Sequence, residues 1–237
     1  RTLAKELLYE YRVVHVDIGH MDKNRELAKR FEAGFTGGVP FLTVLDADGK
    51  ALKNQRTDVF ETKNADGKEG KNGHDPVKLL AFLKDLEAKP LIAEEVMKAQ
   101  LAAAEKSDRL VLLHFGAPWC GWCRKMEVWM ARPEVAAILD KEFVDLKIDV
   151  DRMPGGKEIQ TQYNLKPKGI PWFVFVDSSG KALATSEDAN GNNIGFPSEP
   201  QEIEHFTKML ETTHRKLSKE DIEKLAASLR AEAKVHP

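Results

Sequence analysis

The sequence predicts an α/β protein built from two copies of one small domain, each with strands and helices in the order βαβαββα. Two pairs of similar segments carry the repeat: YRVVHVDIG with FVDLKIDVD, and GGVPFLTVLDADGKAL with KGIPWFVFVDSSGKAL. In the second copy, two apolar runs typical of buried strands flank a helical segment, and a hairpin follows. Two strands joined by a helix favour parallel pairing, whereas the hairpin adds antiparallel strands.

The repeat also fixes the expected domain boundaries. Asp17 corresponds to Asp149, and Pro40 corresponds to Pro171, so the two copies keep the same order with a one-residue change in one loop. We expect a first copy over residues 1–88, a second over 89–215, and a C-terminal helix over 216–237. Because Arg1 corresponds to Pro133, the first copy lacks its opening strand in this chain. Whether that copy has a cysteine pair of its own further upstream is left open.

The second copy can be assigned element by element. Expected helices, from apolar periodicity, are Ile92–Ala104, Cys123–Met130 continuing over Pro133–Asp140, Ile159–Tyr163 and Glu202–Thr213. Expected strands are Leu110–Phe115, Phe143–Asp149, Trp172–Val176 and Lys181–Thr185, the last two joined by a turn at Asp-Ser-Ser-Gly. Ser218 and Asp221 approximate a capping box, which predicts a terminal helix to about Lys234 that packs on one side.

Composition excludes several classes of function. Lys and Arg total 36 against 38 Asp and Glu, a net charge of −2, which gives no support for nucleic acid as a partner. No apolar run approaches the ~20 residues that span a bilayer, so we expect a protein that is not membrane-embedded. The chain starts at Arg1 rather than Met and shows no signal peptide, which suggests a processed or partial form of a longer chain.

The two cysteines, Cys120 and Cys123, are the candidate active site. They follow a buried strand and begin a helix, where unpaired N–H groups favour a thiolate, so the pKa of Cys120 should lie below that of a free thiol. Cys123 lies one helical turn later and can attack a mixed disulfide on Cys120. We therefore expect redox chemistry, with Cys120 the more acidic and more exposed thiol.

Alternatives to redox chemistry are weaker. A zinc site needs a second pair of ligands, a c-type haem site needs His where Arg124 stands, and a purely structural disulfide over so short a loop stabilises little. Asp46-Ala-Asp48-Gly49 and the segment 64–67 lack the ligand spacing of a calcium loop and indicate turns. We expect no metal and no cofactor beyond the dithiol itself.

These residues resemble the thioredoxin superfamily. The motif WCGWC follows an apolar strand, and Ile170-Pro171 precedes a hairpin about fifty residues later. The resemblance covers about residues 92–213 with the motif and 1–86 without it. It implies that Cys120 attacks, Cys123 resolves, and Pro171 is a cis-proline facing the disulfide.

The resemblance also implies where substrate binds. Ile170 would supply backbone for a substrate strand, and Trp119 and Trp122 would form an exposed aromatic surface beside the dithiol. Trp172 and Trp129 are expected in the core. The Gly-Trp centre of the motif is similar to that of a subset of bacterial thioredoxin-like domains.

One position departs from the family. Six residues before the attacking cysteine, thioredoxins carry a buried Asp that assists proton transfer, and this chain has His114. Asp145 lies where thioredoxins carry a Lys. Two interpretations stay open: His114, paired with Asp145, moves the proton of Cys123, or His114 is a hydrogen-bonded core residue without a kinetic role.

Together these features predict a thiol-disulfide oxidoreductase that acts on protein thiols and disulfides and exchanges electrons with an upstream donor or acceptor protein. The alternative is a tandem peptide-binding or chaperone module with secondary redox activity. The direction of electron flow is open, because related dithiols span about −270 to −120 mV. The expected compartment is bacterial and extracytoplasmic, with the cytoplasm as the alternative.

Overall fold

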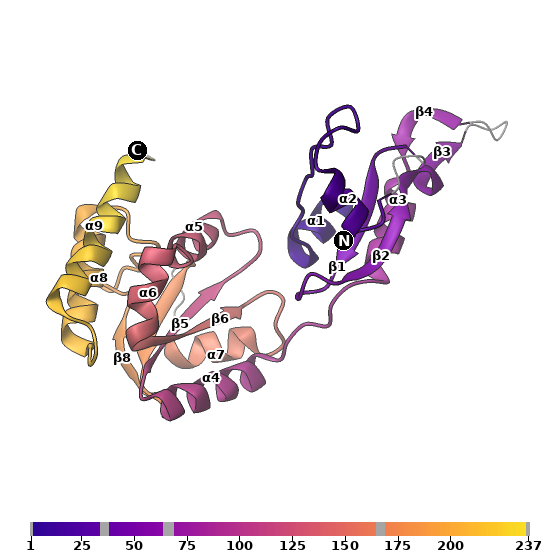
Figure 1. Ribbon diagram of the computed structural model, residues 1–237. Coiled ribbons are helices and arrows are strands. Elements are labelled where there is room, and N and C mark those ends of the chain that lie inside the picture. Colours follow the sequence, from indigo (N-terminus) through magenta and orange to yellow (C-terminus); the bar gives the residue numbers. More distant parts are fainter. Residues whose placement is uncertain (1, 34–37, 64–68, 165–168, 236–237) are drawn as a thin grey trace. The chain divides into compact units, whose positions relative to one another are not determined.

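The computed structural model describes residues 2–33, 38–63, 69–164 and 169–235 (Figure 1). The chain divides into two compact units, Arg1–Lys89 and Pro90–Pro237. Segment 64–67, which the sequence predicts to be a turn, lies outside the described residues.

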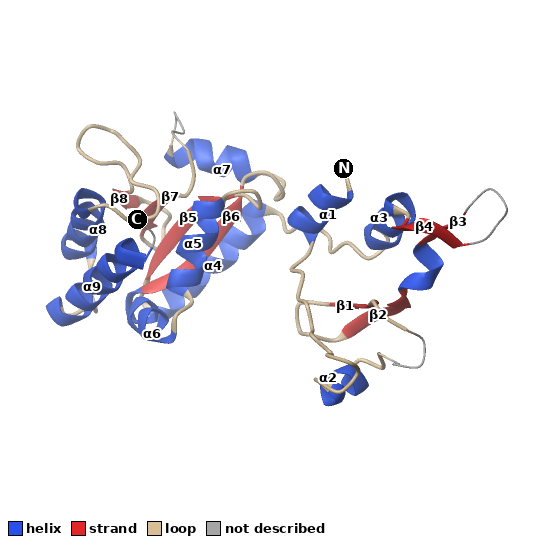
Figure 2. Ribbon diagram, turned by 90° about the horizontal axis from the view of Figure 1, so that it is seen from above, coloured by secondary structure: helices blue, strands red, loops and turns tan. Residues whose placement is uncertain are grey.

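The first unit contains two separate hairpins, shown in Figure 2. Its helices are α1 (Leu3–Glu10), α2 (Arg25–Arg30) and α3 (Pro76–Lys84), and its strands are β1 (Phe41–Leu45), β2 (Ala51–Arg56), β3 (Glu61–Lys63) and β4 (Glu69–His74). The pairs β1–β2 and β3–β4 are antiparallel, and a 3₁₀ helix, Thr57–Phe60, joins them.

The first unit differs from the second where the sequence repeat predicts a match. Residues 11–18, which correspond to a strand of the second unit, form no strand, and Val13, Val14 and Val16 are exposed. A strand needs a neighbour to take up its N–H and C=O groups. Among the described residues of the first unit, no segment occupies the place of a central strand between 11–18 and β1.

The second unit is a four-stranded sheet covered by helices on both faces. Its strands are β5 (Leu110–Gly116), β6 (Phe143–Asp149), β7 (Trp172–Val176) and β8 (Ala182–Thr185), in the order β6-β5-β7-β8. β5 is parallel to β6 and antiparallel to β7, and β7 is antiparallel to β8. Its helices are α4 (Ala93–Ser107), α5 (Gly121–Met130), α6 (Pro133–Glu142), α7 (Gly156–Tyr163), α8 (Pro200–Thr213) and α9 (Lys219–Val235). The α/β fold and the βαβαββα order of this unit are confirmed.

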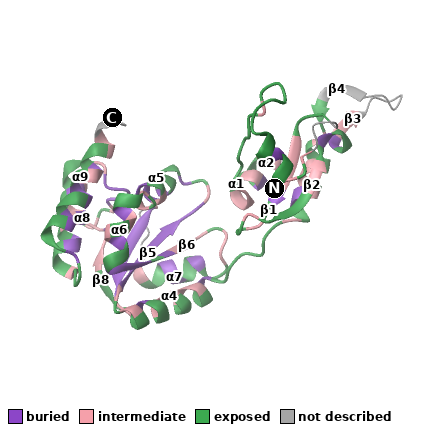
Figure 3. Ribbon diagram, in the orientation of Figure 1, coloured by how far each residue is buried: buried purple, intermediate pink, exposed green. Residues whose placement is uncertain are grey.

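The side chains of β5 alternate between two cores, and all of its residues are buried (Figure 3). Leu110 and Leu112 pack with α5, α6, α8 and α9, whereas Val111, Leu113 and Phe115 pack with α4 and α7. This period of two places His114 and Gly116 on the face that α5 covers. The strand therefore presents one polar side chain and one glycine to the helix that carries the cysteines.

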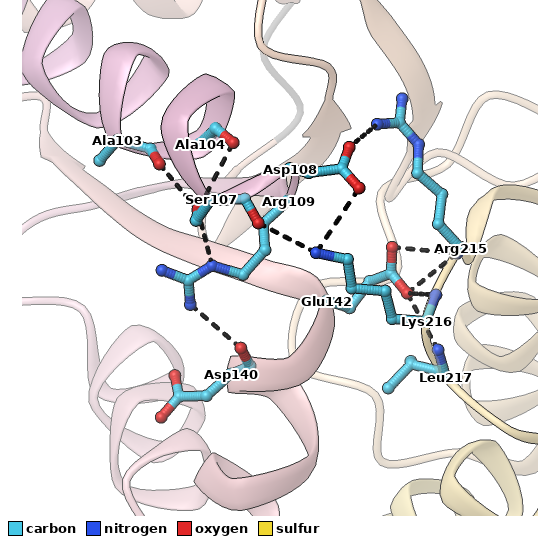
Figure 4. Close-up of polar contacts among 10 residues, drawn as sticks. All are labelled: Ala103, Ala104, Ser107, Asp108, Arg109, Asp140, Glu142, Arg215, Lys216 and Leu217. Carbon is cyan, nitrogen blue, oxygen red and sulfur yellow. Dashed lines mark hydrogen bonds and ion pairs between the residues drawn. The ribbon is translucent and has the colours of Figure 1, made fainter.

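A buried carboxylate holds the connection between α8 and α9. Glu142, at the end of α6, is fully buried and accepts backbone N–H groups of Arg215, Lys216 and Leu217 at 2.7–3.1 Å (Figure 4). Lys216 also donates from Nζ to the carbonyl of Ser107 at 3.0 Å. The cluster lies where β5 and β6 begin, at the end of the sheet opposite the cysteines.

The last helix begins as the sequence predicts. Asp221 Oδ2 accepts the Ser218 N–H and hydroxyl, and the Asp221 N–H donates back to Ser218 Oγ at 3.1 Å. On its apolar side, α9 buries Leu225 and Leu229 in the core that α5 shares. Trp129 of α5 donates from Nε1 to Ser228 Oγ of α9 at 3.0 Å. This hydrogen bond joins α9 to α5, the helix that begins at the two cysteines.

Candidate active site

The two cysteines form a disulfide at the start of α5, with an S–S distance of 2.03 Å. Cys120 is the N-cap residue, and its Sγ accepts the backbone N–H of Cys123 at 3.1 Å. A capping sulfur is in the position where the free N–H groups of a helix stabilise negative charge. The geometry therefore suits a thiolate on Cys120 when the pair is reduced.

Burial does not distinguish the two cysteines. Cys120 is 5% exposed and Cys123 is 4% exposed in this disulfide form, and the greater exposure of the Cys120 thiol stays a prediction for the reduced pair. The Ile170 carbonyl oxygen lies 3.5 Å from Cys120 Sγ. A disulfide sulfur carries no proton, so this is a contact rather than a hydrogen bond. The Ile170–Pro171 and Val39–Pro40 peptide bonds are both cis.

Two half-exposed indole rings flank the disulfide. Trp119 is 55% exposed and donates from Nε1 to Asp151 Oδ2 at 2.7 Å. Trp122 is 50% exposed, and Lys125 Nζ lies 4.4 Å from its ring centroid. Trp172, by contrast, is fully buried against Phe115 in the other core.

His114 is buried and paired with a carboxylate. It is 3% exposed, and its Nε2 lies 2.9 Å from Asp145 Oδ1. The Asp145 side chain is 58% exposed, so this carboxylate keeps most of its contact with water. The pairing that the sequence suggested is present. Gly116 stands two residues along the same face of β5, so the Cα atoms of His114 and Gly116 are about 7 Å apart.

Sequence reasoning missed a glycine and an ion pair next to Cys123. A methyl group at Gly116 would lie 3.4 Å from Cys123 Sγ and 4.0 Å from Lys147 Cε, so the missing side chain lets the cysteine approach the sheet. Lys147 Nζ lies 2.5 Å from Glu127 Oε1, which comes from α5. A glycine that directly follows an apolar strand, just before the cysteine motif, is a signal of close approach that could have identified this position.

In the described part of the chain, no cluster of three or more His, Cys, Asp or Glu side chains could hold a metal ion. Among the described helices, none has the length and apolar character that would let it cross a bilayer.

The cysteine pair lies at a helix N-terminus and packs against a cis X–Pro bond, and the helix lies on a mixed sheet. Together these features define a protein of the thioredoxin superfamily. More narrowly, the chain belongs to the family described as Thioredox_DsbH (protein of unknown function, DUF255), whose model matches residues 78–232. That match covers well over half of the chain and includes the second unit through most of α9.

Individual relatives are more distant. Protein disulfide-isomerase erp38 of Neurospora crassa is 28% identical over 197 residues, which cover 80% of this chain and 47% of that protein. Thiol:disulfide interchange protein DsbD of Vibrio vulnificus is 31% identical over 116 residues, which cover 48% of this chain and 18% of that protein. A disulphide isomerase structure from Xylella fastidiosa is 34% identical, with a TM-score of 0.37, over 41% of this chain and 78% of that one. The chain thus spans less than half the length of these two curated relatives.

Proposed function

We propose that this chain is a thiol-disulfide oxidoreductase that exchanges disulfides with protein partners through Cys120 and Cys123. The observation that carries the proposal is the N-capping sulfur of Cys120, which accepts the Cys123 N–H and lies beside the Ile170 carbonyl. This arrangement combines a stabilised thiolate with backbone that an extended substrate can pair with. Relatives named as disulfide isomerase and thiol:disulfide interchange proteins support the same reaction class.

The reaction has two thiolate attacks. In the reducing direction, the Cys120 thiolate attacks a substrate disulfide, forms a mixed disulfide and releases one substrate thiolate. The Cys123 thiol then loses its proton and attacks Cys120 Sγ, which forms the Cys120–Cys123 disulfide and releases the second substrate thiolate. Two electrons pass to the substrate, and a dithiol protein or small dithiol must return them. The oxidising direction is the reverse.

The residues around the dithiol have separate roles in this scheme. His114, paired with Asp145, takes the proton of Cys123. Trp119 and Trp122 provide an apolar surface for the substrate. Ile170 and Pro171 provide the backbone to which an extended segment binds. No metal or cofactor takes part in the scheme.

We place the reaction in an extracytoplasmic compartment of a bacterium. The chain has 2 cysteines, and both belong to the dithiol, so no stray thiol is exposed to oxidation. The two units are further proposed to be tandem copies of one domain, 1–88 and 89–215, followed by the helix of 216–237.

Trapping the mixed disulfide tests the proposed function. Cys123→Ser leaves the attacking thiol without its resolving partner, so it should accumulate a covalent complex with a disulfide-containing protein that survives non-reducing electrophoresis. Cys120→Ser is the matched control and should form no complex. If instead both variants bind an unfolded protein without a covalent bond, and the wild type shows no turnover, the peptide-binding alternative is supported.

A further inference from the structure

The side chain of Asn193 forms hydrogen bonds with the backbone that lies beside Cys120. The Ile170 carbonyl oxygen lies 3.5 Å from Cys120 Sγ. On either side of Ile170, the carbonyl oxygens of Pro171 and Gly169 accept from Asn193 Nδ2 at 2.9 and 3.4 Å. The Asn193 amide therefore fixes the carbonyl groups on both sides of Ile170, next to the cis Ile170–Pro171 bond.

Asn193 is itself fixed in one orientation. Its Oδ1 accepts the Ser186 hydroxyl at 2.9 Å and the Gly195 N–H at 3.1 Å, so both ends of the amide are engaged. Ser186 is fully buried, and its Oγ also accepts the N–H of Phe173 at 3.0 Å. The network therefore connects the Ile170 backbone to the second residue of β7.

The connection between β8 and α8 brings Asn193 to this place. A bridge pairs Glu187 with Asn193, and Asp188 Oδ1 accepts the N–H groups of Asn190 and Asn192 at 2.9 and 2.8 Å. This tight turn returns the chain alongside the end of β8. Asn190 is exposed at the tip of the same turn.

We propose that Asn193 is a positioning residue that holds the Ile170–Pro171 backbone in the orientation in which it pairs with an extended polypeptide. The proposal rests on the proposed function and adds a determinant of specificity to it. A polypeptide substrate uses the Ile170 backbone, whereas a small disulfide reaches the sulfur of Cys120 without it. Asn193 therefore favours polypeptides over small disulfides.

The test replaces the N–H donor of the Asn193 side chain by an acceptor and keeps the size and shape of the side chain. Asn193→Asp keeps an acceptor for Ser186 and Gly195 but faces two carbonyl oxygens with an oxygen instead of an N–H. Asn193→Ala removes the side chain without repulsion and serves if the Asp variant does not fold. Asn190→Asp is the matched control, because it adds the same charge at the exposed tip of the same turn.

Two readouts separate this inference from the proposed function. The first is the affinity of the disulfide form for S-alkylated insulin B chain, an extended polypeptide without free thiols. The second is the rate at which the reduced form reacts with glutathione disulfide. We expect both Asn193 variants to weaken B-chain binding about tenfold relative to Asn190→Asp and the wild type, and to keep the glutathione rate within about twofold.

Other results overturn the inference. Equal B-chain affinity in the Asn193 and Asn190 variants, or no B-chain binding by the wild type, would show that this backbone does not receive a polypeptide. A parallel fall in the glutathione rate would show that Asn193 acts on the dithiol instead. If the wild type binds the B chain but does not react with glutathione disulfide, the inference stands and the proposed oxidoreductase function fails.

Discussion

His114→Ala tests whether the buried histidine moves the proton of Cys123. The substitution removes a side chain that is 3% exposed and leaves a cavity, which typically costs about 2–4 kcal/mol of unfolding free energy. Its partner Asp145 is 58% exposed and stays solvated, so no buried charge is left unpaired. A domain of ordinary stability, about 5–15 kcal/mol, remains folded after this loss.

The kinetic effect should fall on one step. A positioned general base contributes about 10²–10⁴-fold to a proton transfer, so resolution of the mixed disulfide by Cys123 should slow at least about 100-fold. Attack by Cys120 uses a thiolate stabilised by the helix N-terminus and should change by less than about threefold. Rapid-mixing kinetics with a fluorescent peptide disulfide measures the two steps separately, with thermal melting to report stability.

Leu112→Ala is the matched control for damage to the core. Leu112 is 1% exposed, stands two residues before His114 and faces the same helices, so its removal leaves a cavity without removing a titratable group. This variant should lose similar stability and keep the wild-type rate of resolution. The reasoning is refuted if His114→Ala resolves at the wild-type rate, or if Leu112→Ala slows resolution equally.

Three other results are expected. Glu142→Ala removes the acceptor of the Arg215, Lys216 and Leu217 N–H groups, of which only the last belongs to a buried residue, so urea unfolding should show a loss of about 1–3 kcal/mol; a loss under about 0.5 kcal/mol would contradict that role. The Lys141 ammonium, which donates to Asp221, lowers the pKa of that carboxyl together with the N–H and hydroxyl groups of Ser218, from 3.8 to about 2. Asp221 therefore contributes stability above about pH 4 that is lost as the pH falls toward 2, and melting curves of Asp221→Asn should converge with wild type there; a pH-independent difference would argue against this pairing. In the reduced protein, mass mapping after brief iodoacetamide treatment should find Cys120 alkylated before Cys123, and the opposite order would reverse their roles.

The sequence predicted the second unit well because its signals are local. The two central strands, β5 and β7, are apolar runs in which every residue is buried, and the helices follow apolar periods. The cap at Ser218 and Asp221 depends on residues three positions apart. Cys120 and Cys123 are likewise close in sequence, so their meeting at a helix N-terminus needs no long-range contact.

The parts that sequence reasoning missed depend on long-range contacts. Asn193 meets Pro171 across 22 positions, through a turn whose path no apolar pattern indicates. Lys147 and Glu127 are brought together only when α5 packs on the sheet. In the first unit, the similarity of residues 11–18 to β6 does not yield a strand, because strand formation depends on a partner rather than on the segment alone.

The most direct test of the central claim is the reduction potential of the Cys120–Cys123 pair, measured by equilibrating the protein with glutathione buffers and quantifying free thiols. A redox-active pair should equilibrate reversibly as a two-electron couple, with a potential between about −270 and −120 mV. A disulfide that stays oxidised at every ratio, with a potential below about −300 mV, would be a structural crosslink and would contradict the account.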